Sequence, residues 1–170
     1  MTDRASEAPT GVRIRRAAAA DRPAVARFLT EHWGAPIVVS RGALHAADEL
    51  PALIAEAEGE PAWAGLLTYR VHDDACEIVS LDAVPAGRGV GTALVTELVR
   101  QLGADRIRRL WLITTNDNLA ALRFYQRRGF VLAALHPRAI EISRRLKPTI
   151  PPVGEGGIPI RDELELERML

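Results

Sequence analysis

Three glycines at alternate positions, Gly87, Gly89 and Gly91, separate an apolar segment from an amphipathic one. We expect a strand to lead into this loop and a helix to leave it. The first N–H groups of such a helix have no partner within it, and the helix dipole places partial positive charge at the same point. Glycines let a ligand approach the backbone closely, and Arg88 can add a charged contact. The pattern predicts a binding site for phosphate.

The spacing of this loop disfavours two common nucleotide-binding motifs. A P-loop has a lysine before the Ser or Thr that follows its last glycine, whereas Thr92 follows Gly91 directly. A dinucleotide-binding fingerprint has a small residue where Leu94 stands, and an acidic residue where the next strand ends in Thr114 and Thr115. ATP hydrolysis and dinucleotide binding are therefore disfavoured. A glycine-rich turn without a ligand remains open at this point.

A second motif follows in the run from Thr114 to Phe130, where Asn118 begins the pattern Asn-x-x-Ala-x-x-x-Tyr-x-x-x-Gly-Phe. Asn118 is a suitable N-cap for a helix, and Gly129 suits the left-handed residue that ends one. The two motifs together, in this order and at this separation, resemble those of the GNAT superfamily of acyl-CoA N-acyltransferases. The resemblance covers residues 12–136.

The resemblance implies an α/β (α+β) fold with a mixed, mostly antiparallel central sheet flanked by helices. Two of its strands splay apart to bind acetyl-CoA. Residues 12–136 are expected to form the GNAT core, and residues 137–170 a helix, a loop and a terminal strand that complete the same domain. Residues 1–11 are polar and turn-forming, and we expect a disordered tail there.

Hydrophobic periodicity predicts the individual elements. The predicted strands are 12–15, 37–39, 53–57, 63–71, 76–84, 110–114 and 130–135, and the predicted helices are 19–33, 92–102, 119–128 and 137–147. The strands between 36 and 84 are expected to form an antiparallel meander. The alternating run Glu163–Glu167 predicts a terminal edge strand with solvated glutamates, although a helix is the alternative.

The resemblance also implies where acetyl-CoA, the cosubstrate, is held. In the family the pantetheine arm lies between the splayed strands, and the pyrophosphate rests on the glycine loop. Carried over to this sequence, the pantetheine contacts are Ala83 and Val84, with Asn118, Ala121 and Tyr125 on the other side, and the pyrophosphate contacts are Gly87, Arg88, Gly89, Val90, Gly91 and Thr92.

One position departs from the family pattern. The family usually has Gln or Arg three positions before the first of the last two glycines of the loop. That glycine is Gly89 in this chain, and Ala86 stands at the position in question. Because backbone N–H groups supply most phosphate contacts, we expect binding to be retained, with Arg88 compensating.

Two catalytic residues are predicted. Tyr125 matches the family tyrosine near the cofactor sulfur, and a phenol can protonate a leaving thiolate while staying neutral itself at pH 7. Glu77 resembles in position the base of related histone acetyltransferases. Asp82 is its rival and, by strand alternation, should face the opposite side of the sheet. Backbone N–H groups near Ala83 are expected to polarise the thioester carbonyl. No role is assigned to His32, His45 or His136.

Composition limits the classes of partner. The 170 residues contain 22 basic and 22 acidic side chains, so no positive charge points to nucleic acid. A single cysteine, Cys76, excludes an internal disulfide and a multi-thiolate metal site, and we expect no metal. No apolar run approaches the roughly eighteen residues of a membrane helix. These features predict a cytoplasmic protein that binds no membrane.

The sequence thus predicts an N-acetyltransferase that transfers acetyl directly from acetyl-CoA to a primary amine of a small molecule or peptide. The alternative is a non-catalytic acetyl-CoA-binding sensor or interaction module, and a longer acyl-CoA is a third possibility. The acidic residues between Asp162 and Glu167 could attract a cationic amine. A homodimer is plausible from family habit: an exposed C-terminal strand could pair with a second copy, although its glutamates argue against an unprotected edge.

Overall fold

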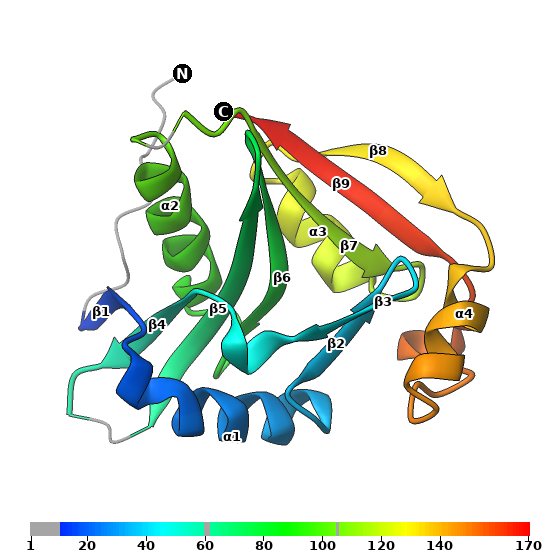
Figure 1. Cartoon of the computed structure of the whole chain (residues 1–170), viewed down its shortest axis with the longest axis horizontal. Coiled ribbons are helices and arrows are strands. Elements are labelled where there is room, and N and C mark those ends of the chain that lie inside the picture. The colour runs from blue at the N-terminus through cyan, green and yellow to red at the C-terminus, as the bar shows by residue number, and fades with distance from the viewer. Residues whose placement is uncertain (1–10, 60–61, 105) are drawn as a thin grey trace.

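The computed structural model describes residues 11–59, 62–104 and 106–170 (Figure 1). Residues 1–10 of the predicted tail lie outside this part of the chain. The elements are β1 (Val12–Arg16), α1 (Arg22–Trp33), β2 (Ile37–Ser40), β3 (Ala43–Ala46), β4 (Ala52–Ala57), β5 (Trp63–His72), β6 (Ala75–Ala83), α2 (Val90–Leu102), β7 (Arg109–Thr115), α3 (Leu119–Gln126), β8 (Val131–His136), α4 (Ala139–Leu146) and β9 (Glu163–Met169).

Within the described residues, seven strands form one sheet in the order β1-β4-β5-β6-β7-β9-β8. Strands β6 and β7 are parallel, and the other neighbours in this sheet are antiparallel. The predicted mixed, mostly antiparallel sheet is therefore confirmed. In the described chain, no helix is long and apolar enough to cross a membrane.

Two apolar clusters cover the two faces of the sheet. Adjacent residues of β4, such as Leu53 and Ile54, belong to different clusters, because side chains alternate across a strand. One cluster joins the sheet to α2 and α3, and its members include Leu94, Leu98 and Leu102 at helical spacing. The other cluster joins the sheet to α1 and to the β2–β3 hairpin.

The predicted meander is only partly correct. Strands β2 and β3 pair with each other in a separate two-stranded sheet, from Ile37↔Ala46 to Ser40↔Ala43. The sequence analysis missed β3, because Ala43–Ala46 lacks the β-branched residues that identify a strand. The hairpin lies over one face of the sheet, while β4, β5 and β6 form the antiparallel run as expected.

The prediction that Glu163–Glu167 is an edge strand is wrong. Strand β9 lies between β7 and β8, as Figure 1 shows for the red arrow beside the yellow one. Two of its three glutamates are buried: Glu163 is 1% exposed and Glu165 is 7% exposed.

Other elements supply the hydrogen bonds that these buried carboxylates need. Glu163 accepts from the Arg41 N–H at 2.8 Å and from the Ser143 hydroxyl at 3.0 Å. Glu165 pairs with Arg109 and with His136. The C-terminal strand is thus unavailable for pairing with a second copy, and the exposed edge at this end of the sheet belongs to β8.

Candidate active site

A gap opens between β6 and β7, because the two strands pair only from Ala75↔Arg109 to Ile78↔Leu112. Beyond Ile78 the partners diverge. The opening begins at a β-bulge, since Ser80 pairs with Thr68 and Ile78 with Tyr69, which leaves Val79 as the extra residue. A cavity of about 510 Å³ occupies the gap. Its walls come from β6, the glycine loop, α2, β7 and α3, with Trp33 of α1.

The glycine loop forms one end of this cavity. Gly87 and Gly89 have φ of 87° and 81°, values that L side chains rarely adopt, and Gly89 is the N-cap of α2. The Ala93 N–H donates to the Gly89 carbonyl at 3.0 Å, so the N–H groups before Ala93 have no carbonyl within the helix. The loop therefore presents free donors where the sequence predicts a phosphate site.

Gly91 allows α2 to approach α3 closely. A Cβ at this position would lie 3.3 Å from the Phe124 ring, a tighter contact than side chains normally make. Helices α2 and α3 therefore pack against each other where both line the cavity.

The predicted cofactor-binding residues divide into two groups. Those that line the cavity are Ala83, Gly87, Gly89, Gly91, Thr92, Asn118, Ala121 and Tyr125. Val84, Arg88 and Val90 are absent from this lining within the described chain. Val90, the first residue of α2, is 2% exposed and packs in the apolar core. The Val84 N–H donates to the Ala64 carbonyl at 2.8 Å.

Helix α3 forms another wall of the cavity, and its start is capped as predicted. The Asn118 side chain accepts a hydrogen bond from the Ala121 N–H at 3.0 Å. Tyr125 is 6% exposed, and its ring makes edge contacts with Phe124 and Phe130. Among the described residues, no group hydrogen-bonds its hydroxyl. Burial raises the pKa of Tyr125, and the Asp82 charge raises it further, so the phenol keeps its proton at neutral pH.

Asp82 lies in the same cavity as Tyr125. Its Oδ2 accepts a hydrogen bond from the Trp33 indole at 2.5 Å. Burial raises the pKa of this carboxyl, while the Trp33 hydrogen bond acts in the opposite direction. A carboxylate whose pKa is raised towards neutrality is a better proton acceptor than an exposed one.

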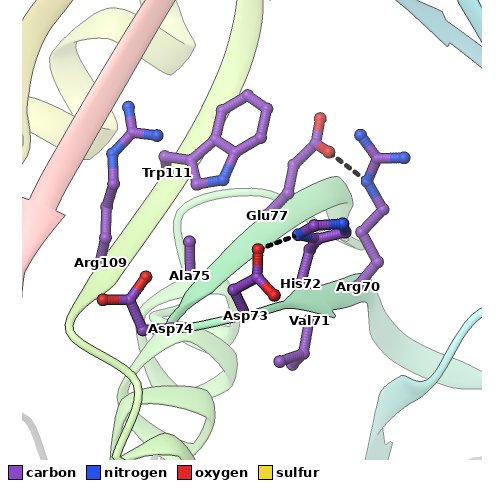
Figure 2. A pocket seen from close by; sticks show the side chains of 9 residues that line it. All are labelled: Arg70, Val71, His72, Asp73, Asp74, Ala75, Glu77, Arg109 and Trp111. Carbon is purple, nitrogen blue, oxygen red and sulfur yellow. Dashed lines mark hydrogen bonds and ion pairs between the residues drawn. The ribbon is translucent and has the colours of Figure 1, made fainter.

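Glu77 lies elsewhere. It lines a second cavity, of about 360 Å³. Figure 2 shows its side chain between those of Arg70 and Trp111. Arg70 Nε donates to Glu77 Oε2 at 2.5 Å. Burial raises the pKa of Glu77, and Arg70 opposes that change. The structure thus does not bring Glu77 into the cavity that holds Tyr125.

The prediction that Glu77 and Asp82 face opposite sides of the sheet is wrong. Glu77 pairs with Arg70 and Asp82 with Leu66, and positions 66 and 70 of β5 share one face. The bulge at Val79 adds one residue to β6 and restores the two carboxylates to the same side. A bulge has no clear signature in the sequence.

The cavity residues that the sequence analysis missed include Trp33 and Arg128, whose side chains can donate hydrogen bonds. The sequence does show that Arg128 is a basic residue between Tyr125 and Gly129 of the second motif. None of the three histidines considered earlier is among the described residues that line this cavity.

Comparison with known proteins identifies the fold and the family. The sequence model of the acetyltransferase (GNAT) family matches residues 17–130. The chain belongs to the GNAT family. The predicted GNAT fold is thus confirmed, and the family makes this chain an acyltransferase whose general chemistry is acetyl transfer.

Relatives of this GNAT chain include two proteins that are each 42% identical to it, YxbD and YdhI of Bacillus subtilis (strain 168). The uncharacterized protein YxbD of Bacillus subtilis (strain 168) is 42% identical over 146 residues, which are 86% of this chain and 91% of that protein. Among solved GNAT structures, an IAA acetyltransferase from Bacillus cereus ATCC 14579 matches with a TM-score of 0.71 and 20% identity, covering 94% of this chain and 99% of that one. A GNAT acetyltransferase from Elizabethkingia anophelis with acetyl-CoA bound gives 0.67 and 17%, covering 95% and 99%. These structures share the fold.

Proposed function

We propose that this protein is an N-acetyltransferase that uses acetyl-CoA and transfers the acetyl group directly to a primary amine of a small molecule or peptide. The observation that carries the proposal is one cavity with free backbone donors at the glycine loop and with Tyr125 and Asp82 beside the strand gap. Its supporting comparison is a GNAT structure with acetyl-CoA bound. The buried free thiol of Cys76 suits a reducing cytosol, where we place the activity.

The residues present fit this cosubstrate. The loop from Gly87 to Thr92 would hold the pyrophosphate, and Ala83, Asn118 and Ala121 would line the pantetheine arm. When bound, acetyl-CoA supplies an acetyl thioester, in which the amine nitrogen takes the place of sulfur. The chain must then remove a proton from the amine and deliver one to the departing sulfur.

Tyr125 is our proposed general acid. It is buried in the cavity, its pKa is raised, and its hydroxyl makes no hydrogen bond to the rest of the described chain. The phenol therefore holds a proton that it can donate when a stronger base appears beside it.

For the base we propose Asp82 in preference to Glu77. Asp82 shares the cavity with Tyr125, its charge acts on that phenol, and its indole partner leaves the second carboxylate oxygen available. Glu77 is paired with Arg70 in the other cavity. The assignment of Glu77 remains a prediction that the same experiment tests.

Calorimetry with acetyl-CoA tests the cosubstrate. We expect wild type to bind and Ala86→Glu to bind more weakly, because this residue lines the cavity and the new carboxylate would repel phosphate. Ala86→Gln is the matched control, with similar volume and no charge, and should bind at least as well as wild type. Absence of binding to wild type would remove the enzyme proposal.

Thiol release on a panel of amines tests catalysis. With an amine that is turned over, Tyr125→Phe and Asp82→Asn should each lower kcat by about 100-fold or more, while Glu77→Gln should leave it near wild type. If Glu77→Gln lowered kcat and Asp82→Asn did not, Glu77 would be the base. Binding of acetyl-CoA with no turnover across the panel would instead support a non-catalytic acetyl-CoA-binding module.

A further inference from the structure

Arg128 is fixed in place at the N-terminal end of α2. Its Nε donates to Thr92 Oγ1 at 3.1 Å, an Nη2 hydrogen is directed at the same oxygen, and Nη1 donates to the Phe124 carbonyl at 2.6 Å. The guanidinium carbon lies 3.6 Å from the centroid of the Phe124 ring. These contacts hold a cation at the edge of the cavity.

This cation has no anionic partner in the described chain. Other guanidinium groups of the sheet, such as that of Arg109, pair with carboxylates, whereas Arg128 forms no ion pair there. Burial lowers the pKa of Arg128, and the neighbouring charge of Arg127 lowers it further. The positive end of the α2 dipole also disfavours the charged form of the Arg128 guanidinium. A fixed, partly desolvated cation in this position is stabilised when an anion binds.

Two of its donors remain for such an anion. A guanidinium carries five N–H groups, and the contacts with Thr92 and Phe124 use three of them. Thr92 is in the first turn of α2, so these two donors lie near the free N–H groups of the glycine loop. Backbone donors, helix dipole and guanidinium therefore converge on one region of the cavity.

We propose that Arg128 is a ligand of the pyrophosphate of the acyl-CoA cosubstrate, supplying from the turn after α3 the polar group that the loop lacks at Ala86. This inference rests on the proposed function. It also replaces the expectation that Arg88 compensates for Ala86, since Arg88 is not among the described residues of the cavity wall.

Binding of three compounds tests the assignment: coenzyme A, its 3′-dephospho form, which keeps the pyrophosphate, and pantetheine, which has no phosphate. In calorimetry, Arg128→Met should bind coenzyme A and dephospho-coenzyme A about 10- to 100-fold more weakly than wild type does. It should bind pantetheine with the wild-type affinity. Arg128→Gln, which keeps a hydrogen-bonding amide without the charge, should show the same pattern if Arg128→Met fails to fold. Arg127→Met is the control, because Arg127 is exposed and outside the cavity wall, and it should bind all three as wild type does.

Three results would overturn the inference. The first is unchanged binding of coenzyme A by a folded Arg128 variant. The second is an equal loss with pantetheine, which would make the residue a packing element of the wall. The third is a loss with coenzyme A but not with the dephospho form, which would assign the contact to the 3′-phosphate. Failure of wild type to bind coenzyme A would instead remove the proposed function itself.

Discussion

The indole nitrogen of Trp33 lies 2.5 Å from Oδ2 of Asp82, so the last residue of α1 is hydrogen-bonded to the strand that forms one wall of the cavity. Helix α1 and Val79 of β6 also belong to the same apolar cluster on that face of the sheet. The hydrogen bond fixes the orientation of the carboxylate and stabilises its charged form.

Replacing Trp33 by Phe should move the acid limb of the pH–rate profile to higher pH. The indole hydrogen bond lowers the pKa of Asp82, so its loss raises that pKa. A base must be deprotonated, and kcat/KM will therefore begin to fall at a higher pH as the solution is acidified. The profile is measured on an amine that is turned over. An acid limb at the wild-type position would show that another group titrates there.

Adding one methyl group at Gly65 should destabilise the fold. A Cβ there would lie 2.7 Å from the Asp82 carbonyl oxygen and 2.9 Å from Val90 Cγ1, so β5 would have to move away from both β6 and α2. We expect Gly65→Ala to lower the free energy of unfolding by about 1–3 kcal/mol in a urea titration.

Gly103→Ala is the control for that measurement. Gly103 has α-helical backbone angles, and its nearest contact with an added Cβ is an ordinary 3.6 Å. Its free energy of unfolding should be unchanged or raised by up to about 1 kcal/mol. Equal effects of the two substitutions would contradict the close approach at Gly65.

Glu163 should be important for stability, because it satisfies donors from two distant elements. Glu163→Ala leaves the Arg41 N–H and the Ser143 hydroxyl without their acceptor. We expect the free energy of unfolding to fall by about 2–4 kcal/mol, and Glu163→Gln, which keeps one acceptor oxygen, to lose less. Ser143→Ala combined with Glu163→Ala should cost less than the sum of the two single changes. A near-neutral Glu163→Ala would mean that the carboxylate is solvated.

Asp21 should make stability depend on pH in the acid range. Hydrogen bonds from Arg15 and from the Ala18 N–H lower its pKa from 3.8 to about 2. A carboxyl group whose pKa is depressed on folding contributes its full stabilisation above the unfolded value, and loses it as the pH falls from about 4 towards 2.

The test compares Asp21→Asn with wild type by urea unfolding at pH 7 and near pH 3. The substitution should cost about 1 kcal/mol at pH 7 and less in acid. Asp73→Asn is the control, because the pair of Asp73 with His72 is more than four-fifths exposed. It should stay within about 0.5 kcal/mol of wild type at pH 7. A cost at Asp21 that does not change with pH would contradict the lowered pKa.

Local patterns predicted the elements that bury a regular apolar stripe. Helix α2 was expected from 92 and begins at Val90, and α3 was expected at Leu119 and begins there. In both cases spacing and capping residues are adjacent in sequence, so the information is local. Strand β9 was also located, but its place in the sheet was not.

Long-range contacts explain what the sequence could not predict. The donor that makes Glu163 compatible with burial is the backbone of Arg41, which belongs to a hairpin far away in the sequence. The face of Asp82 depends on a bulge at Val79, and the position of Arg128, in the turn after α3, depends on Thr92 of α2. Alternation and motif spacing describe one segment at a time, and these three relationships each join two segments.

The placement of β9 between β7 and β8 also determines the order in which the sheet can be completed during translation. Strand β8 leaves the ribosome before β9, which is made only after α4 and the loop behind it. Until β9 emerges, β7 has one open edge and β8 has no neighbouring strand. Val131 and Leu132 of β8 are 60% and 56% exposed even in the finished fold, so β8 presents apolar side chains throughout. Nascent chains that stall before Glu163 would therefore present one open strand edge, at β7, and one unpaired strand, β8, and both favour aggregation.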